Sequence, residues 1–272
     1  MTKITVLGSG TAVSSFYKPF DFRAPPGYLL EHDGKQYLIE CSDGMRGRLE
    51  KIKIDYFSID SIFISHFHPD HFSILPFIQS IYVRTRWANQ KKEINIYGPK
   101  GMENKLRTFW EMTHFKGSYD ERIVPFLKIN FFEFGNKKKF ILEKNLSVTS
   151  FSVHHESRRM DAYAMRFQIG QKVFTYSGDC GPCQGVNEAA EGADLLISEC
   201  SADIGVDHSE YGHFNSYQVG AMAAKRNVKT LVLSHLTNKY SPSELVADVL
   251  ESGFTGVVKA AEDRDVLQLE NA

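Results

Sequence analysis

The residues most able to do chemistry lie in one short segment, His66-Phe67-His68-Pro69-Asp70-His71. Three imidazoles and a carboxylate are ligands that zinc, iron and manganese accept, and no thiolate is needed. A polar turn at the end of a strand does not need so many ligand groups. Because side chains alternate along an extended chain, His66 and His68 are expected to face one side while Asp70 and His71 turn to another. One loop can then serve two adjacent metals.

The composition is that of an ordinary globular protein. The chain has 272 residues, of which 42% are hydrophobic and 24% charged, and its formal net charge is -1. This charge argues against a protein that coats nucleic acid by bulk electrostatics. Four cysteines are too few for a disulfide scaffold at this length. With no signal-peptide pattern and no apolar run of about 18 residues, we expect a cytoplasmic protein that does not span a membrane.

The elements that must hold these ligands are strands and helices of a mixed α/β protein. The apolar run Ser61–Ser65 predicts a buried strand leading directly into His66, and Asp33-Gly34 predicts a hairpin turn. The other expected strands cover residues 4–7, 28–30, 36–39, 94–97, 146–153, 163–169, 172–176 and 230–233, and the expected helices cover 45–52, 72–92 and 216–225. We predict a single domain of residues 1–272, with residues of about 75–140 as a cap or decoration.

The histidine segment resembles the signature loop of the metallo-β-lactamase superfamily, and the sequence as a whole resembles its ribonuclease Z-like branch. The resemblance extends to four further motifs, namely residues 4–11, residues 39–44, Ser177-Gly178-Asp179 and Leu233-Ser234-His235. It implies an α/β fold, the αββα sandwich of two mixed β-sheets flanked by helices. It also implies that Asp43, in the second motif, supports the metal loop by contacting the ligands without binding the metal itself.

The same resemblance implies a site for two divalent metal ions, expected to be zinc with manganese and iron as alternatives. The first ion would be held by His66, His68, His155 and Asp179, and the second by Asp70, His71, His235 and the shared Asp179. Either His154 or His155 can supply the ligand that follows the strand at 146–153, and His155 is the preferred candidate. Only one of the two should reach the metal, because successive residues on a strand point to opposite sides.

Three residues are expected to act directly in catalysis. Attack by a metal-bound hydroxide, oriented by Asp70, follows from a two-metal site. The resemblance assigns a role at the leaving oxygen to His213, partnered by Glu199 at the end of an earlier strand. A protonated histidine oriented by a glutamate is a reasonable general acid. The plainer alternative is a loop histidine near a helix and an unrelated acid at a strand end.

The leading prediction is a metal-dependent phosphodiesterase acting on a small nucleotide-like or RNA-derived phosphodiester. The alternative is a lactone or thioester hydrolase, in which the metals polarise a carbonyl group. Transfer-RNA 3′ processing is disfavoured because residues 156–178 leave room for only two strands and a turn, not for the substrate-binding arm of the bacterial enzymes. An iron redox protein is disfavoured because the chain has no flavin domain. A homodimer is left open by analogy with relatives.

Two other motifs are weaker indications of function. Gly8-Ser9-Gly10 follows a strand but lacks the third glycine of a dinucleotide-binding loop. Cys180-Gly181-Pro182-Cys183 has the spacing of the thioredoxin motif, yet it follows Asp179 directly rather than opening a helix in a thioredoxin-like unit. We therefore expect no redox role for these cysteines.

Overall fold

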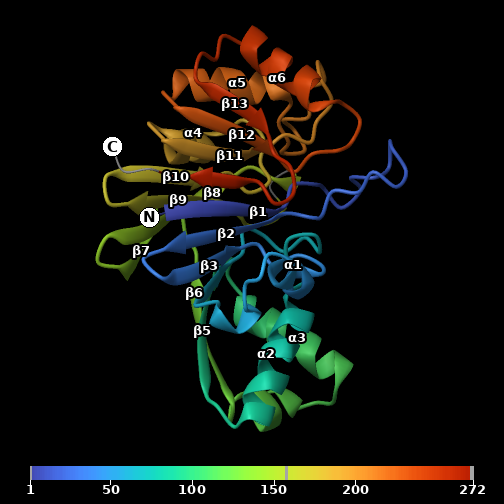
Figure 1. The fold of residues 1–272 in the computed structure, drawn as a ribbon, viewed down its shortest axis with the longest axis vertical. Coiled ribbons are helices and arrows are strands. Elements are labelled where there is room, and N and C mark those ends of the chain that lie inside the picture. The colour runs from blue at the N-terminus through green and yellow to red at the C-terminus, as the bar shows by residue number, and fades with distance from the viewer. Residues whose placement is uncertain (1, 157–158, 270–272) are drawn as a thin grey trace.

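Two seven-stranded β-sheets organise the chain in the computed structural model, which describes residues 2–156 and 159–269 (Figure 1). The first sheet has the order β14-β1-β2-β3-β4-β5-β6. Its strands are β1 (Thr2–Gly8), β2 (Gly27–His32), β3 (Lys35–Ile39), β4 (Ser61–Phe63), β5 (Lys92–Gly98), β6 (Leu127–Glu133) and β14 (Val266–Gln268). Strands β3 to β6 are parallel, whereas β14, β1, β2 and β3 pair in antiparallel fashion.

The second sheet repeats this plan with the order β13-β12-β11-β10-β9-β8-β7. Its strands are β7 (Lys138–Glu143), β8 (Leu146–Val153), β9 (Ala162–Ile169), β10 (Lys172–Tyr176), β11 (Leu195–Glu199), β12 (Thr230–Ser234) and β13 (Val257–Ala260). Strands β10 to β13 are parallel, and β7 to β10 are antiparallel. Both sheets are therefore mixed, as predicted.

Alternation along the strands divides the core into layers. In β2, Tyr28 and Leu30 enter the apolar layer between the sheets, while Leu29 faces the opposite side and packs under the helices. The helices of the first sheet are α1 (Met45–Lys51), α2 (Ile74–Ala88) and α3 (Met102–Thr113), with short turns η1 (Tyr56–Ser58) and η2 (Tyr119–Ile123). Those of the second are α4 (Gln184–Ala190), α5 (Ser216–Lys225) and α6 (Pro242–Glu251). Figure 1 shows the two helical layers on opposite outer sides, which confirms the predicted αββα sandwich.

The region between residues 74 and 143 is more regular than its sequence indicates. Helix α2 ends at Ala88 rather than near residue 92, because Asn89 adopts a left-handed conformation and β5 begins at Lys92. Helix α3 and strands β6 and β7 follow, where no regular element was predicted. Lys138 and Lys139 belong to β7, the outermost strand of its sheet. An edge strand tolerates exposed lysines, and this masks its strand character in the sequence.

The parallel strands end at a common edge of the sandwich. Glu40 follows β3, Asp179 lies shortly after β10, Glu199 ends β11 and His235 follows β12. The carboxyl ends of parallel strands are where open α/β sheets place their binding sites. Among the described residues, no helix combines the length and the apolar character needed to cross a membrane.

Candidate metal centre

The first cluster of metal-binding side chains consists of His66, His68, His155 and Asp179, whose donor atoms all lie within 4.8 Å of one another. His66 and His68 come from the loop after β4, and His155 comes from the end of β8. Nε2 of His155 lies 3.1 Å from Nδ1 of His68. The buried His66 ring is held by the Ser65 hydroxyl, 2.9 Å from its Nδ1. Three different loops thus direct ligand atoms to one point.

The second cluster consists of Asp70, His71 and His235. Oδ2 of Asp70 lies 3.4 Å from Nε2 of His235 and 3.7 Å from Nε2 of His71. Asp179 joins the two clusters, since its Oδ1 lies 3.3 Å from Nε2 of His71 and its Oδ2 lies 3.4 Å from Nε2 of His235. The structure therefore brings all seven predicted ligands together, with Asp179 between the two groups.

Several of these ligand atoms are buried without a hydrogen-bond partner. They are Nε2 of His66, Nε2 of His71 and Oδ1 of Asp179. Buried polar atoms without partners carry a desolvation cost of roughly 1–3 kcal/mol each, so their grouping at one point requires an explanation. A metal ion bound here would satisfy them. Imidazole nitrogens and carboxylate oxygens without a thiolate fit zinc, manganese or iron.

The charges of the cluster are strongly coupled. Burial alone would raise the pKa of the Asp179 carboxyl, but the surrounding histidines, above all His235 and His71, hold it well below its ordinary value. Burial likewise opposes protonation of His235, yet Asp179 and Asp70 raise the pKa of this imidazole to about 9. The site therefore holds an anionic centre that attracts positive charge, either as protons or as metal ions.

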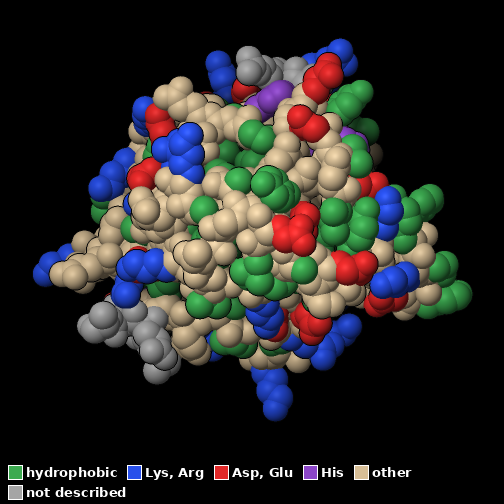
Figure 2. All heavy atoms as spheres, turned by 90° about the horizontal axis from the view of Figure 1, so that it is seen from above, with side chains coloured by type: hydrophobic (Ala, Val, Ile, Leu, Met, Phe, Trp, Pro, Cys, Tyr) green, Lys and Arg blue, Asp and Glu red, His purple; other side chains and the backbone are tan. Residues whose placement is uncertain are grey.

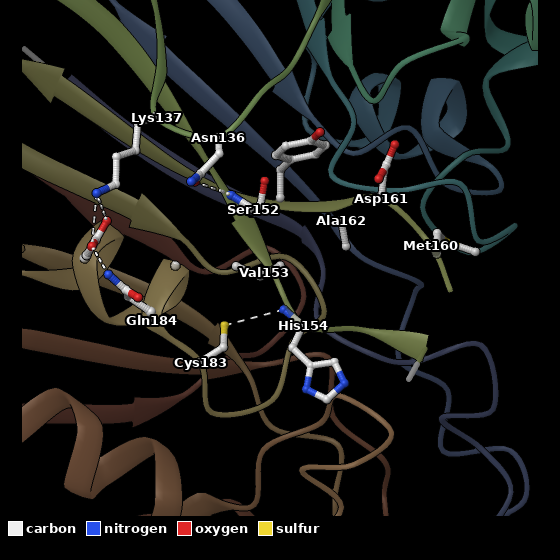
Figure 3. A pocket seen from close by; sticks show the side chains of 13 residues that line it. Asn136, Lys137, Ser152, Val153, His154, Met160, Asp161, Ala162, Cys183 and Gln184 are labelled. Carbon is white, nitrogen blue, oxygen red and sulfur yellow. Dashed lines mark hydrogen bonds and ion pairs between the residues drawn. The ribbon is translucent and has the colours of Figure 1, made fainter. Parts of the chain in front are cut away.

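The two adjacent histidines after β8 differ in their surroundings. His155 is buried, with Nδ1 3.3 Å from the carbonyl oxygen of Gly212 and Nε2 directed at the first cluster. His154 instead lines a separate hollow of about 440 Å³ together with Met160, Asp161 and Cys183, and Figure 3 shows its ring at the edge of this hollow. Its backbone N–H donates to Sγ of Cys183 at 3.4 Å. The geometry favours His155 as the ligand.

The acid that supports the metal loop is Glu40, and the prediction of Asp43 for this role is wrong. Oε1 of Glu40 lies 3.4 Å from Nδ1 of His71, and both side chains are fully buried. The carboxylate also accepts the backbone N–H of Ser65 at 3.2 Å. Asp43 is exposed beside α1, and it contributes a carbonyl oxygen to Arg48. A signal was present in the sequence, because Glu40 directly follows the buried strand β3 as His66 and His235 follow theirs.

His213 and Glu199 also lie together beside the clusters. Nδ1 of His213 is 3.5 Å from Oε2 of Glu199, and the same Oε2 is 3.9 Å from Nδ1 of His235. Glu199 is fixed by the N–H of Phe214, which donates to its Oε1 at 2.5 Å. Burial lowers the pKa of His213, but the Glu199 carboxylate outweighs it and leaves the pKa raised. The ring of His213 lies 5.1 Å from that of His155, measured between centroids.

Cys180, which follows Asp179, is in an environment that disfavours a thiolate. Cys180 is fully buried, and this burial raises the pKa of its thiol well above the ordinary value. Redox-active pairs need a lowered thiol pKa at their nucleophile.

The described part of residues 156–178 consists mainly of β9 and β10, as the length of this stretch predicted.

Comparison with known proteins identifies the family. The model of the beta-lactamase superfamily domain matches residues 35–236. A ribonuclease Z from Ignicoccus hospitalis is 30% identical over 274 residues, which cover 88% of this chain and 89% of that protein. The chain therefore belongs to the metallo-β-lactamase superfamily, in its ribonuclease Z-like branch. It is a metal-dependent hydrolase of this fold, and its two His/Asp clusters fit a dinuclear metal site.

Solved structures support the fold independently. The metallo-β-lactamase fold protein YhfI from Bacillus subtilis superposes with a TM-score of 0.79 at 23% identity, covering 98% of both chains. The short form of human tRNase Z superposes with a TM-score of 0.74 at 22% identity. The superposition covers 99% of this chain and 100% of the human chain. At such identities the superposition concerns the fold and leaves the substrate open.

Proposed function

We propose that this protein is a two-metal phosphodiesterase that hydrolyses a small nucleotide-like or RNA-derived phosphodiester, with zinc as its metal. The observation that carries the proposal is the pairing of His213 with the buried Glu199 beside the metal clusters. An alkoxide leaving group of a phosphodiester needs a proton donor, and a histidine with a raised pKa can supply one. The similarity to ribonuclease Z points to the same bond type.

Asp70 and His213 are assigned to different steps of the reaction. Two divalent ions held by the clusters would lower the pKa of a water molecule and neutralise charge on a phosphoryl oxygen. Asp70 is partly accessible, with 13% of its side chain exposed, whereas only 3% of Asp179 is exposed. Asp70 is therefore the carboxylate able to orient the attacking water. His213, with 26% of its side chain exposed, is also accessible and serves the leaving oxygen.

A hollow beside Asp70 supports a substrate of nucleotide size. It measures about 860 Å³. Its walls include the apolar side chains of Phe22 and Pro25 and equal numbers of basic and acidic side chains, namely Arg48, Lys51, Arg264, Asp43, Asp70 and Asp263. Apolar walls with a few charged groups are typical of sites for small organic ligands. An aromatic ring and cations suit a base and a phosphate.

The surface charge supports a small substrate rather than a long nucleic acid. On the face over α5 and α6, which Figure 2 shows, acidic and basic side chains are interspersed and form no continuous basic field. Proteins that hold long nucleic acids use such fields to bind phosphates. The short stretch that contains β9 and β10 also supports this choice.

The test is turnover of bis(p-nitrophenyl) phosphate by the zinc- or manganese-loaded protein, beside a thioester substrate. We expect the diester to be hydrolysed and turnover to fall at least about 100-fold in Asp70→Ala. His213→Ala should lose more activity on a diester with a poor leaving group than on a thioester, whose thiolate leaves without a proton. Hydrolysis of the thioester alone would replace this proposal with an acyl hydrolase.

A further inference from the structure

Ser201 lies between the two residues of the proposed proton donor pair. Its hydroxyl oxygen is 2.8 Å from Oε2 of Glu199 and 2.9 Å from Nδ1 of His213. The direct separation between His213 and Glu199 is 3.5 Å, which is longer than a good hydrogen bond. Glu199 therefore contacts the imidazole electrostatically, while the hydrogen bond at Nδ1 of the ring is formed with Ser201.

The direction of these hydrogen bonds follows from the available protons. Ser201 has one hydroxyl proton, and a carboxylate can only accept, so this proton goes to Glu199. The backbone N–H of Ser201 donates to the same oxygen at 3.0 Å, which fixes the residue in place. The remaining lone pairs of the hydroxyl then face Nδ1 of His213. Nδ1 must carry a proton, because two acceptors at 2.9 Å would repel each other.

This arrangement determines what the other ring nitrogen can do. Nε2 of His213 has no hydrogen-bond partner within the part of the chain that the structure describes, and it is not among the buried atoms. The tautomer of an imidazole is set by the hydrogen bond at its other nitrogen. With Nδ1 protonated and bound to Ser201, Nε2 is the only position at which the ring can take up and release a proton.

We propose that Ser201 is a positioning residue that holds His213 as the Nδ1–H form and directs Nε2 toward the leaving oxygen. This inference rests on the proposed phosphodiesterase function. During hydrolysis the water oxygen forms a bond to phosphorus and the bond from phosphorus to the leaving oxygen breaks. The leaving oxygen takes the proton from Nε2, and His213 is reprotonated from solvent as the water releases its proton. The sum is diester plus water to monoester plus alcohol.

The kinetic test compares two substrates that differ only in their leaving group. Thymidine 5′-(p-nitrophenyl phosphate) has a good leaving group, and thymidine 5′-(phenyl phosphate) has a poor one that needs a proton. In Ser201→Ala we expect kcat for the phenyl ester to fall about 10- to 100-fold, as for other residues that orient a functional histidine. For the p-nitrophenyl ester we expect a change of less than about threefold. Ser201→Thr keeps the hydroxyl and should restore the phenyl ester to near wild-type turnover.

Ser209→Ala is the matched control. Ser209 lies in the same loop and its hydroxyl also bonds a carboxylate, that of Asp207, but among the described residues no hydrogen bond joins this hydroxyl to His213. Removing the Ser209 hydroxyl should leave the turnover of both esters unchanged. The inference would be overturned if Ser201→Ala lost activity on both esters equally, or if Ser201→Thr did not recover activity on the phenyl ester. Either result would assign Ser201 a structural role.

A second measurement does not depend on turnover. The ¹⁵N resonances of the His213 ring in zinc-loaded protein, assigned with His213→Gln, report which nitrogen carries the proton when the ring is neutral. We expect the Nδ1–H form in wild type and in Ser201→Thr, and a shift toward the Nε2–H form in Ser201→Ala. An unchanged tautomer in Ser201→Ala overturns the inference. If wild type cleaves neither ester, the proposed function fails, while the tautomer still decides the role of Ser201.

Discussion

Nδ1 of His71 lies 3.4 Å from Oε1 of Glu40, so a ligand of the second cluster is oriented by an acid from a different strand. The contact is fully buried on both sides. A carboxylate in this position fixes the imidazole ring and increases its basicity toward a metal. The Glu40–His71 pair therefore links the end of β3 to the metal loop that follows β4.

We expect Glu40→Gln to weaken metal binding at the second cluster by about 10- to 100-fold. The amide keeps the size of the side chain and can still accept the Ser65 N–H, but it cannot stabilise positive charge on the His71 ring. Zinc affinity measured by competition with a chelator is the readout. Asp43→Asn is the control, because this carboxylate is exposed, and equal losses in both variants would contradict the assignment of Glu40.

The choice between the two adjacent histidines can be tested by metal content. His155 directs Nε2 at the first cluster, whereas His154 lines the neighbouring hollow (Figure 3). We expect His155→Ala to retain about one equivalent of zinc after dialysis and His154→Ala to retain two, because only the former loses a ligand. Elemental analysis of the two purified variants measures this. The reverse pattern would make His154 the ligand.

Gly212 is expected to be intolerant of a side chain. Its φ is +85°, and a Cβ atom there would lie 2.4 Å from Cα of His155. Gly212→Ala should lower the free energy of unfolding by about 2 to 4 kcal/mol, through backbone strain and overlap, and weaken metal binding by displacing His155. Gly205→Ala is the matched control, since φ is +75° there and the space around it is open. Only strain of about 1 kcal/mol should remain in that variant, with metal content unchanged.

Asp194 should make stability depend on pH far from the metal centre. Burial raises the pKa of its carboxyl, but the Lys229 ammonium at 2.8 Å and the Val173 N–H at 2.8 Å outweigh this and leave the pKa below its ordinary value. A lowered folded-state pKa gives stability that is present above the unfolded pKa and is lost as pH falls through the folded one.

We therefore expect Asp194→Asn to lower the free energy of unfolding by about 1 kcal/mol at neutral pH, a small value because the Lys229 partner is largely exposed. The difference from wild type should shrink between about pH 5 and about pH 3. Urea unfolding of both proteins across this range is the measurement. A difference that stays constant with pH would show that the carboxylate charge contributes nothing.

Much of the site could be predicted because it depends on local patterns. His66, His68, Asp70 and His71 lie in one loop. Asp179 and His235, which the resemblance to the ribonuclease Z-like branch implied, each follow a buried strand. The same logic was available for Glu40, but Asp43 also offered a carboxylate in the same motif, and only the direction of the chain after β3 distinguishes them. Local sequence does not contain that direction.

The elements that were missed depend on tertiary partners. Strand β6 pairs with β5 along its whole length and β7 with β8, yet both strands carry exposed lysines that break the apolar alternation. Their strand character comes from the pairing itself rather than from propensity. Ser201 was not predicted for a similar reason, since it meets His213 only when the two ends of the connection between β11 and α5 fold together.

The joint action of two metal ions is most directly tested by titrating metal-free protein with zinc while following both bound metal and hydrolysis of bis(p-nitrophenyl) phosphate. We expect hydrolysis to reach its maximum as the second equivalent of zinc binds, because the seven ligand side chains, Asp179 among them, form two sites that act together. Two bound equivalents without diester hydrolysis, or full activity with only one, would contradict it.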